Sequence, residues 1–235
     1  MFKQLTFEQL KEYIEGLELT RPINSVHIHH TWRPRHSDYN GNNGIELQEA
    51  MKRYHVETNK WADIGQHFTL LPDGDFVTGR HLNLTPASIR GHNTGAICLE
   101  MVGNFDIGQD SFEGVQEENA YCFTGLCMKL FDIGPSDIIF HREKDPTITC
   151  PGTSINQQSF IINSNLRYER FKNEGSSNMF NDMEKVSYWA KNGVDKMHKT
   201  SIMVGDRDRN FNPRDNVTRE ELAVTINNLL RYIGK

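Results

Sequence analysis

Two histidines and a cysteine stand where they can bind one metal ion together. His27, His29 and His30 end a segment with the alternating apolar pattern of a strand, which places His27 and His29 on the same face. His141 ends a later strand-like segment, and Cys150 follows nine residues further on. Zinc prefers imidazole and thiolate ligands, and three protein ligands leave a fourth position for water, as catalytic zinc requires. The spacing predicts a zinc site of His29, His141 and Cys150, with satisfied histidines and a plain buried thiol as the alternative.

Glu100 is the second residue whose position indicates chemistry. It interrupts the segment Ala96–Val102, whose sequence AICLEMV is otherwise typical of a central strand. A carboxylate is costly to bury there unless it has a partner or a role. Beside a zinc ion it can act as a general base, because zinc lowers the pKa of bound water to ~7 and a positioned carboxylate can take up the proton. An outward-facing or ion-paired strand residue is the alternative.

The elements that must position these residues alternate between strands and helices. Residues 1–17 predict an amphipathic helix with one apolar face, made of Phe7, Leu10, Ile14 and Leu17. Periodicity and turn residues predict the other elements: strands over 21–31, 96–102 and 137–141, a hairpin over 68–78, and helices over 45–55 and 116–131. This order predicts an α/β fold, a mixed central β-sheet flanked by helices, followed by a small helical C-terminal domain.

The overall composition is typical of a soluble globular protein. Hydrophobic residues make up 37% and charged residues 24%, which excludes a disordered or collagen-like chain. No apolar run is long enough to span a bilayer, and residues 1–17 lack the continuous apolar stretch of a signal peptide. We therefore expect a protein made in the cytoplasm, with neither a membrane nor a nucleic acid as its partner.

Charge and composition change late in the chain. Residues 1–182 carry 16 basic and 24 acidic side chains, whereas residues 183–235 carry 10 basic and 7 acidic ones. A basic tail favours an anionic partner surface, although an ordinary solvated module fits as well. The Gly/Ser/Asn-rich stretch 173–178 lies near this change of sign and is typical of a linker. We expect three parts: a catalytic domain over 1–172, a linker over 173–182 and a small domain over 183–235.

A series of short motifs occurs in the order seen in one protein family. The motifs are HHT (29–31), DIGQHF (63–68), PDG (72–74), TGR (78–80), TP (85–86), GHN (91–93), AICLE (96–100), GNFD (103–106), His141 and TCPG (149–152). Together they resemble the type 2 N-acetylmuramoyl-L-alanine amidases, relatives of the peptidoglycan recognition proteins that include many phage endolysins. The similarity covers roughly residues 20–165. It implies a zinc enzyme that hydrolyses the amide between the lactyl group of N-acetylmuramic acid and L-alanine in peptidoglycan.

The resemblance assigns roles to individual residues. It implies His29 as the first zinc ligand rather than His27, His141 as the second and Cys150 as the third. Glu100 matches the acidic residue that many bacterial and phage members use as the catalytic carboxylate.

Two positions depart from the family pattern. Gln66 stands where several relatives have a tyrosine, so a phenol cannot be the acid here. Ile148 occupies the usual place of a threonine or lysine, with Thr147 and Thr149 on either side. We expect a threonine, with Thr149 as the candidate, or His67 to assist at the oxyanion.

The tail has a resemblance of its own. Residues 204–213 and 217–220 are similar to one S-layer homology motif, a module that holds proteins to anionic secondary polymers of Gram-positive walls. The resemblance places Arg219 in the position of the recognition arginine. Thr218 followed by Glu221 is the signature of a capping box, so a helix is expected to begin here. Such modules usually occur in threes, so binding through one motif can require self-association of the chain.

Several alternatives remain at this level. A non-catalytic peptidoglycan receptor on the same scaffold is disfavoured because such receptors usually lack the cysteine found here as Cys150. A zinc endopeptidase that cuts the stem peptide, with His27 and His29 as its ligand pair, is a second alternative. The setting is a phage endolysin or a host autolysin. The lack of a signal-like segment favours an endolysin that stays in the host cytoplasm and reaches the wall after release.

Overall fold

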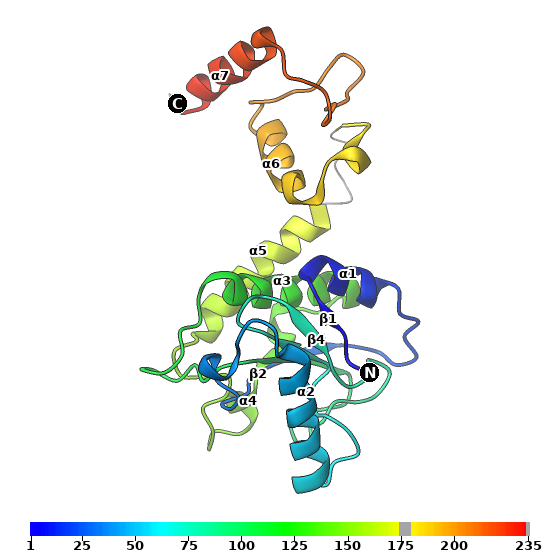
Figure 1. Ribbon diagram of the computed structural model, residues 1–235, viewed down its shortest axis with the longest axis vertical. Helices are drawn as coiled ribbons and strands as arrows, with labels where there is room; N and C mark the ends of the chain where they lie inside the picture. The colour runs from blue at the N-terminus through cyan, green and yellow to red at the C-terminus, as the bar shows by residue number, and fades with distance from the viewer. Residues whose placement is uncertain (174–179, 234–235) are drawn as a thin grey trace. The chain divides into compact units, whose positions relative to one another are not determined.

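The computed structural model describes residues 1–173 and 180–233 (Figure 1). Within these residues, six strands form one mixed sheet in the order β1-β4-β3-β5-β2-β6. The strands β3, β5, β2 and β6 run parallel, while β4 pairs antiparallel with both β3 and β1. The strands are β1 (Gln4–Leu5), β2 (Ser25–His30), β3 (Phe68–Leu70), β4 (Phe76–Thr78), β5 (Ala96–Met101) and β6 (Ile138–Phe140). The predicted α/β fold with a mixed central sheet is confirmed.

Helices cover both faces of this sheet. The first unit contains α1 (Phe7–Glu15), α2 (Gly44–Arg53), α3 (Gly114–Phe131), α4 (His141–Lys144) and α5 (Gln157–Asn173). Figure 1 shows α1, α3 and α5 gathered on one side of the sheet and α2 on the other. Short 3-10 turns at His36–Asp38 and Pro135–Asp137 and a π-helical turn at Tyr54–Thr58 complete the elements.

The main apolar core lies between the sheet and the side covered by α1, α3 and α5. Strand alternation sends Val26 and Ile28 of β2 into this core, and the neighbouring β5 contributes Ile97 and Leu99. Phenylalanine rings fill the layer, and the ring of Phe123 lies 5.7 Å from Phe68 and 5.9 Å from Phe76 between centroids. Burying each such ring stabilises the fold by about 1.5–3 kcal/mol. The opposite face of the same strands is thereby left for polar side chains.

The N-terminal residues differ from the prediction. Gln4 and Leu5 form an edge strand paired with β4, and the helix begins only at Phe7. The reason is a capping box: the Thr6 hydroxyl accepts the amide of Gln9, and the Gln9 side chain accepts the amide of Thr6. The predicted apolar side of this helix is confirmed, since Phe7, Leu10 and Ile14 are buried.

The helix α5 was not foreseen from the sequence. Its apolar residues do not form a clear stripe, because Ile162 and Leu166 are exposed while Phe160 and Phe171 are buried. Asn156 is the local signal that marks its start, since the Asn156 side chain accepts the amide of Ser159.

Residues 173–235 form a second compact unit, separate from residues 1–172. It contains a 3-10 turn (Met183–Lys185), α6 (Tyr188–Lys199) and α7 (Arg219–Ile233). Residues 174–179 of the expected linker lie outside the described residues. Phe180 and Asp182, also assigned to that linker, are instead buried in this unit: Phe180 joins its small core, and the Asp182 carboxylate accepts the amides of Phe211 and Asn212 at 2.7 and 2.8 Å.

The start of α7 follows the prediction. Thr218 and Glu221 form the expected reciprocal pair, in which the Thr218 hydroxyl accepts the Glu221 amide at 3.1 Å and the Glu221 carboxylate accepts the Thr218 amide at 2.7 Å. Leu222 and Ile226, on the predicted apolar side, are each 48% exposed within the described unit. Among residues 1–173 and 180–233, no helix combines the length and apolar character needed to cross a bilayer.

Candidate metal centre and the cleft around it

Two neighbouring strands and one loop bring His29, His141 and Cys150 together. His29 lies near the end of β2, His141 directly follows the adjacent parallel strand β6, and Cys150 lies in the loop after α4. One ligand atom from each residue lies within 4.8 Å of the other two. The predicted grouping of these three residues is confirmed. His27 is on the same strand face as His29 but is not a member of this group among the described residues.

The nitrogen of His29 that faces the centre is Nδ1. It lies 3.4 Å from the Cys150 sulfur, and the His29 and His141 rings are 4.6 Å apart between centroids. The backbone amide of His30 donates to the same sulfur at 3.4 Å. A donor aimed at the sulfur favours the thiolate over the thiol, which is the form that binds a metal.

The electrostatics of these residues suit a bound cation. Burial lowers the pKa of His29 and His141, so both imidazoles are neutral with lone pairs available. Burial also raises the pKa of the Cys150 thiol, so without a cation the thiol keeps its proton. Two neutral imidazoles and one cysteine with converging donor atoms are a donor set that zinc accepts, and they leave a position open. The residues present therefore fit a zinc ion.

The three residues open onto a cleft of about 540 Å³. Glu100, the residue of β5 that stands opposite His29 in the sheet register, lines the same cleft. Its removal from water raises the pKa of Glu100 to about 7. A carboxyl group with this pKa can exchange a proton near neutral pH, and a cation at the neighbouring centre would favour its ionised form.

The threonines around Ile148 lie at the cleft, and their hydroxyls are engaged. Thr147, Ile148 and Thr149 all line it. The Thr149 hydroxyl donates to a carboxylate oxygen of Asp106 at 3.0 Å, and the Thr147 hydroxyl donates to Asp145. A hydroxyl has one proton, so either threonine must release its carboxylate before it can donate to a substrate. The oxyanion role of Thr149 stays a prediction.

The structure does not bring His67 or Gln66 to the cleft. The Nδ1 atom of His67 accepts the backbone amide of Cys98 at 3.0 Å, and its Nε2 atom lies 2.9 Å from the carbonyl of Leu84. Both ring nitrogens are thus used within the fold, which corrects the expected oxyanion role of His67. Gln66 is buried and donates to Thr69 at 2.9 Å, so it takes no part in the cleft either.

An aromatic rim was missed in the sequence. Trp32, His55 and Trp61 line the cleft. The π-helical turn at Tyr54–Thr58 places His55 against Trp61 with ring centroids 4.6 Å apart, and His55 Nδ1 accepts the amide of Gly65 at 3.1 Å. The available signals were Trp32, directly after the HHT motif, and Trp61, two residues before DIGQHF, because an exposed large aromatic beside a site motif marks a binding surface.

A metal-ligand group that opens onto a cleft, with a carboxyl group on the next strand, is the arrangement of catalytic rather than structural metal sites. Comparison with known families agrees with this class. The chain belongs to the N-acetylmuramoyl-L-alanine amidase family, whose model matches residues 19–153. Residues 180–223 match the model of the S-layer homology domain.

Individual relatives are distant. An N-acetylmuramoyl-L-alanine amidase of Sus scrofa is 26% identical over 140 residues, which are 58% of this chain and 23% of that protein. An endolysin of Enterobacteria phage K11 is 22% identical over 101 residues, covering 43% of this chain and 66% of that protein. The crystal structure of bumblebee PGRP-SA has a TM-score of 0.50 at 25% identity and covers 60% of this chain and 81% of its own. The chain thus spans less than a quarter of the pig relative.

The buried, neutral His67 makes stability depend on pH. Burial lowers the pKa of His67 to about 3, against about 6.5 in an unfolded chain, so its contribution is complete above pH 6.5 and is lost as the pH falls toward 3. His67→Asn removes this contribution. Urea unfolding should show that the gap in unfolding free energy between wild type and variant narrows by about 2 kcal/mol from pH 7 to pH 5. A gap that is constant with pH would contradict the neutral, buried state of His67.

Proposed function

We propose that this chain is a zinc-dependent N-acetylmuramoyl-L-alanine amidase that cuts the bond between glycan strand and stem peptide in bacterial peptidoglycan. The observation that carries the proposal is the convergence of His29, His141 and Cys150 within 4.8 Å at a cleft that Glu100 also lines. Membership of the amidase family supports the choice of bond. Cys150 favours an enzyme over a non-catalytic receptor on the same scaffold.

The proposed chemistry divides between the metal and the protein. His29, His141 and Cys150 would hold the zinc ion, which would polarise the scissile carbonyl and lower the pKa of water so that hydroxide is available for the attack. Glu100 accepts a proton from the attacking water and delivers it to the nitrogen of L-alanine as the amide C–N bond breaks. The products are the lactyl carboxylate and a free amino terminus on the stem peptide. Thr149 donates to the developing oxyanion after its hydroxyl leaves Asp106.

The aromatic rim suits the glycan part of the substrate. Trp32 is 54% exposed and Trp61 is 37% exposed, and flat apolar faces of this kind pack against the apolar faces of sugar rings. Both residues line the cleft that holds the metal ligands, so a sugar on the rim lies within the same cleft as the reacting amide.

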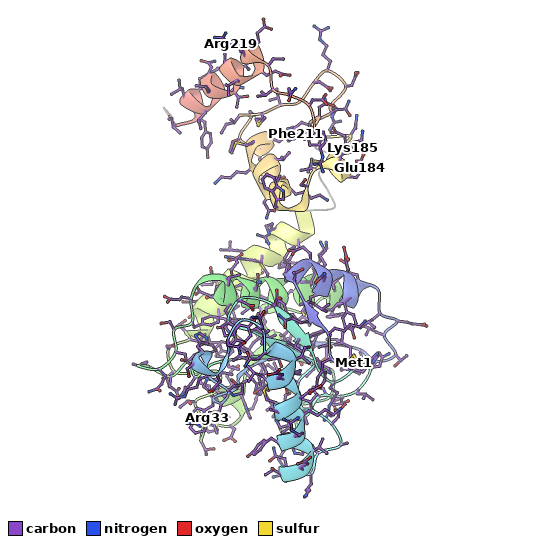
Figure 2. All side chains as sticks on the ribbon, viewed as in Figure 1. Met1, Arg33, Glu184, Lys185, Phe211 and Arg219 are labelled. Atoms are coloured by element: carbon purple, nitrogen blue, oxygen red, sulfur yellow. The ribbon has the colours of Figure 1, made fainter. Side chains whose placement is uncertain are left out.

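The second unit is proposed to hold the enzyme on an anionic secondary polymer of a Gram-positive wall. Its match to the S-layer homology domain supports this role. Arg219 is exposed at the first position of α7 (Figure 2), where a cation opposes the helix dipole rather than stabilising it. A positive charge kept in an unfavourable place for the helix fits a ligand-binding role. Self-association through the tail stays a prediction.

The biological setting we favour is a phage endolysin that acts on the wall from the host cytoplasm after release. The distant similarity to the phage K11 endolysin, at 22% identity, supports this setting. A host autolysin with the same chemistry is the alternative.

The bond that is cut is the first test. Purified Gram-positive walls are digested with the full chain, with and without a chelator, and the new ends are identified by mass spectrometry. We expect free L-alanine amino termini on intact stem peptides, and none with the chelator. Cys150→Ser should abolish activity, whereas Cys122→Ser, which alters a buried thiol on α3 outside the cleft, should retain it. New ends inside the stem peptide would instead identify an endopeptidase.

Glu100 can be tested separately from metal binding. Glu100→Gln keeps the shape of the side chain but cannot accept the proton, so amidase activity should fall by about 10²–10⁴-fold. Zinc content, measured by elemental analysis, should stay at the wild-type value. Glu49→Gln, an exposed carboxyl on α2, is the matched control and should leave activity unchanged. Activity of the Glu100 variant within a few-fold of wild type would rule out the proton-transfer role.

Arg219 offers a test of wall binding in which a loss of binding is not explained by unfolding of the variant. Arg219→Ala removes a cation from the helix N-terminus and should not destabilise α7. Arg231→Ala, in the last turn of the same helix, is the control. In sedimentation with walls that retain their anionic polymers, we expect several-fold weaker binding for the Arg219 variant only, and no difference on walls stripped of these polymers. Equal binding of both variants to intact walls would contradict the assignment.

A further inference from the structure

Two buried ring nitrogens beside the metal centre have no hydrogen-bond partner within the described residues. They are Nε2 of His27 and Nε2 of His29. The two side chains stand on the same face of β2, two residues apart, and their ring centroids are 6.5 Å apart. An unpaired polar atom in the interior costs about 1–3 kcal/mol, so each of these nitrogens requires a partner that the described residues do not supply.

The hydrogen bonds around Ser88 determine which nitrogen of His27 carries the proton. The side-chain oxygen of Asn93 accepts from the Ser88 hydroxyl at 3.0 Å, from the Ser88 amide at 3.0 Å and from the Ile89 amide at 2.8 Å. The single hydroxyl proton of Ser88 is therefore used, and its oxygen accepts from His27 Nδ1 at 2.7 Å. Nε2 of His27 is left with a lone pair.

The opposite holds for His29. Its Nδ1 atom faces Cys150, so metal binding through Nδ1 leaves the proton on Nε2. A metal-bound histidine nearly always donates this second N–H to an acceptor, which orients the ring and increases its basicity as a ligand. The lone pair of His27 Nε2 is an acceptor on the neighbouring side chain.

We propose that His27 is a positioning residue for the metal ligand His29. The His29 Nε2–H donates through one water molecule to His27 Nε2, because the separation of the rings suits a bridging water rather than a direct bond. His27, Ser88 and Asn93 then form a chain of hydrogen bonds that holds His29 in the tautomer that binds the metal. The inference rests on the zinc site proposed above.

The test measures zinc affinity rather than activity. The metal-free full chain competes with a chromophoric chelator for Zn²⁺. The wild type and the Cys150→Ser variant are measured first. His27→Asn keeps a donor for Ser88 but has no acceptor at the position of the His27 Nε2 atom, so we expect zinc affinity to fall by about 10–100-fold. His27→Gln places an amide oxygen near the position of Nε2 and should stay within a few-fold of wild type. Ser88→Ala, which frees Nδ1 and lets the proton move to Nε2, should weaken binding several-fold.

The outcomes separate the two proposals. If the wild type binds no zinc, or if Cys150→Ser binds it as tightly, the zinc site itself fails. Suppose that the wild type binds zinc and the Cys150 variant does not. If the zinc affinity of His27→Asn then equals that of the wild type, or if His27→Gln loses as much zinc affinity as His27→Asn, only the positioning role of His27 is overturned. Thermal unfolding of the metal-free variants provides the folding control, since a purely structural role would lower their unfolding temperatures without separating their zinc affinities. If His27→Asn does not fold, Ser88→Ala becomes the deciding variant, and a zinc affinity of Ser88→Ala equal to that of the wild type overturns the inference.

Discussion

The parallel pairing of β2 with β5 is the constraint on which the rest of the structure depends. Its register sets His27 opposite Cys98 and His29 opposite Glu100, so the polar residues of both strands share one face while their apolar neighbours share the other. The apolar face is buried under α1, α3 and α5, and the polar face carries the site. A slip of one residue would turn the histidines of β2 into the apolar core and turn Val26 and Ile28 toward the site, so packing and chemistry fix the same register.

Burial determines the protonation states of the residues in the site. The imidazoles of His27, His29 and His30 are all removed from water, which lowers the pKa of each, and the Cys150 thiol has its pKa raised for the same reason. The site is therefore nearly neutral before a cation binds, and a bound zinc ion becomes its largest charge. Glu100 lies on the neighbouring strand in the same cleft, so its ionisation is linked to the metal.

Hydrogen bonds between side chains and backbone groups hold the loops that shape this cleft. Asn93 gathers three donors in the turn around Ser88, His67 joins the start of β3 to β5 and to Leu84, and His55 joins the π-helical turn to Gly65. Asn93 and His67 stand in motifs shared with the amidase family, yet their hydrogen-bond partners are the backbone and, for Asn93, also the Ser88 hydroxyl. A residue within a site motif can thus serve the fold rather than the reaction, as His67 does.

The sequence by itself determined the kind of chemistry and the order of the main elements. Ligand types, strand alternation and motif order were enough to predict His29, His141, Cys150 and Glu100, because these depend on local pattern and residue chemistry. Only the tertiary structure decided which polar groups are free to react. The partner of the His27 ring is 61 residues away, and the sulfur beside His29 is 121 residues away, so neither pairing has a local signal. The folded chain engages both nitrogens of His67, binds Thr149 to Asp106 and builds the aromatic rim, because such contacts form only when distant segments pack together.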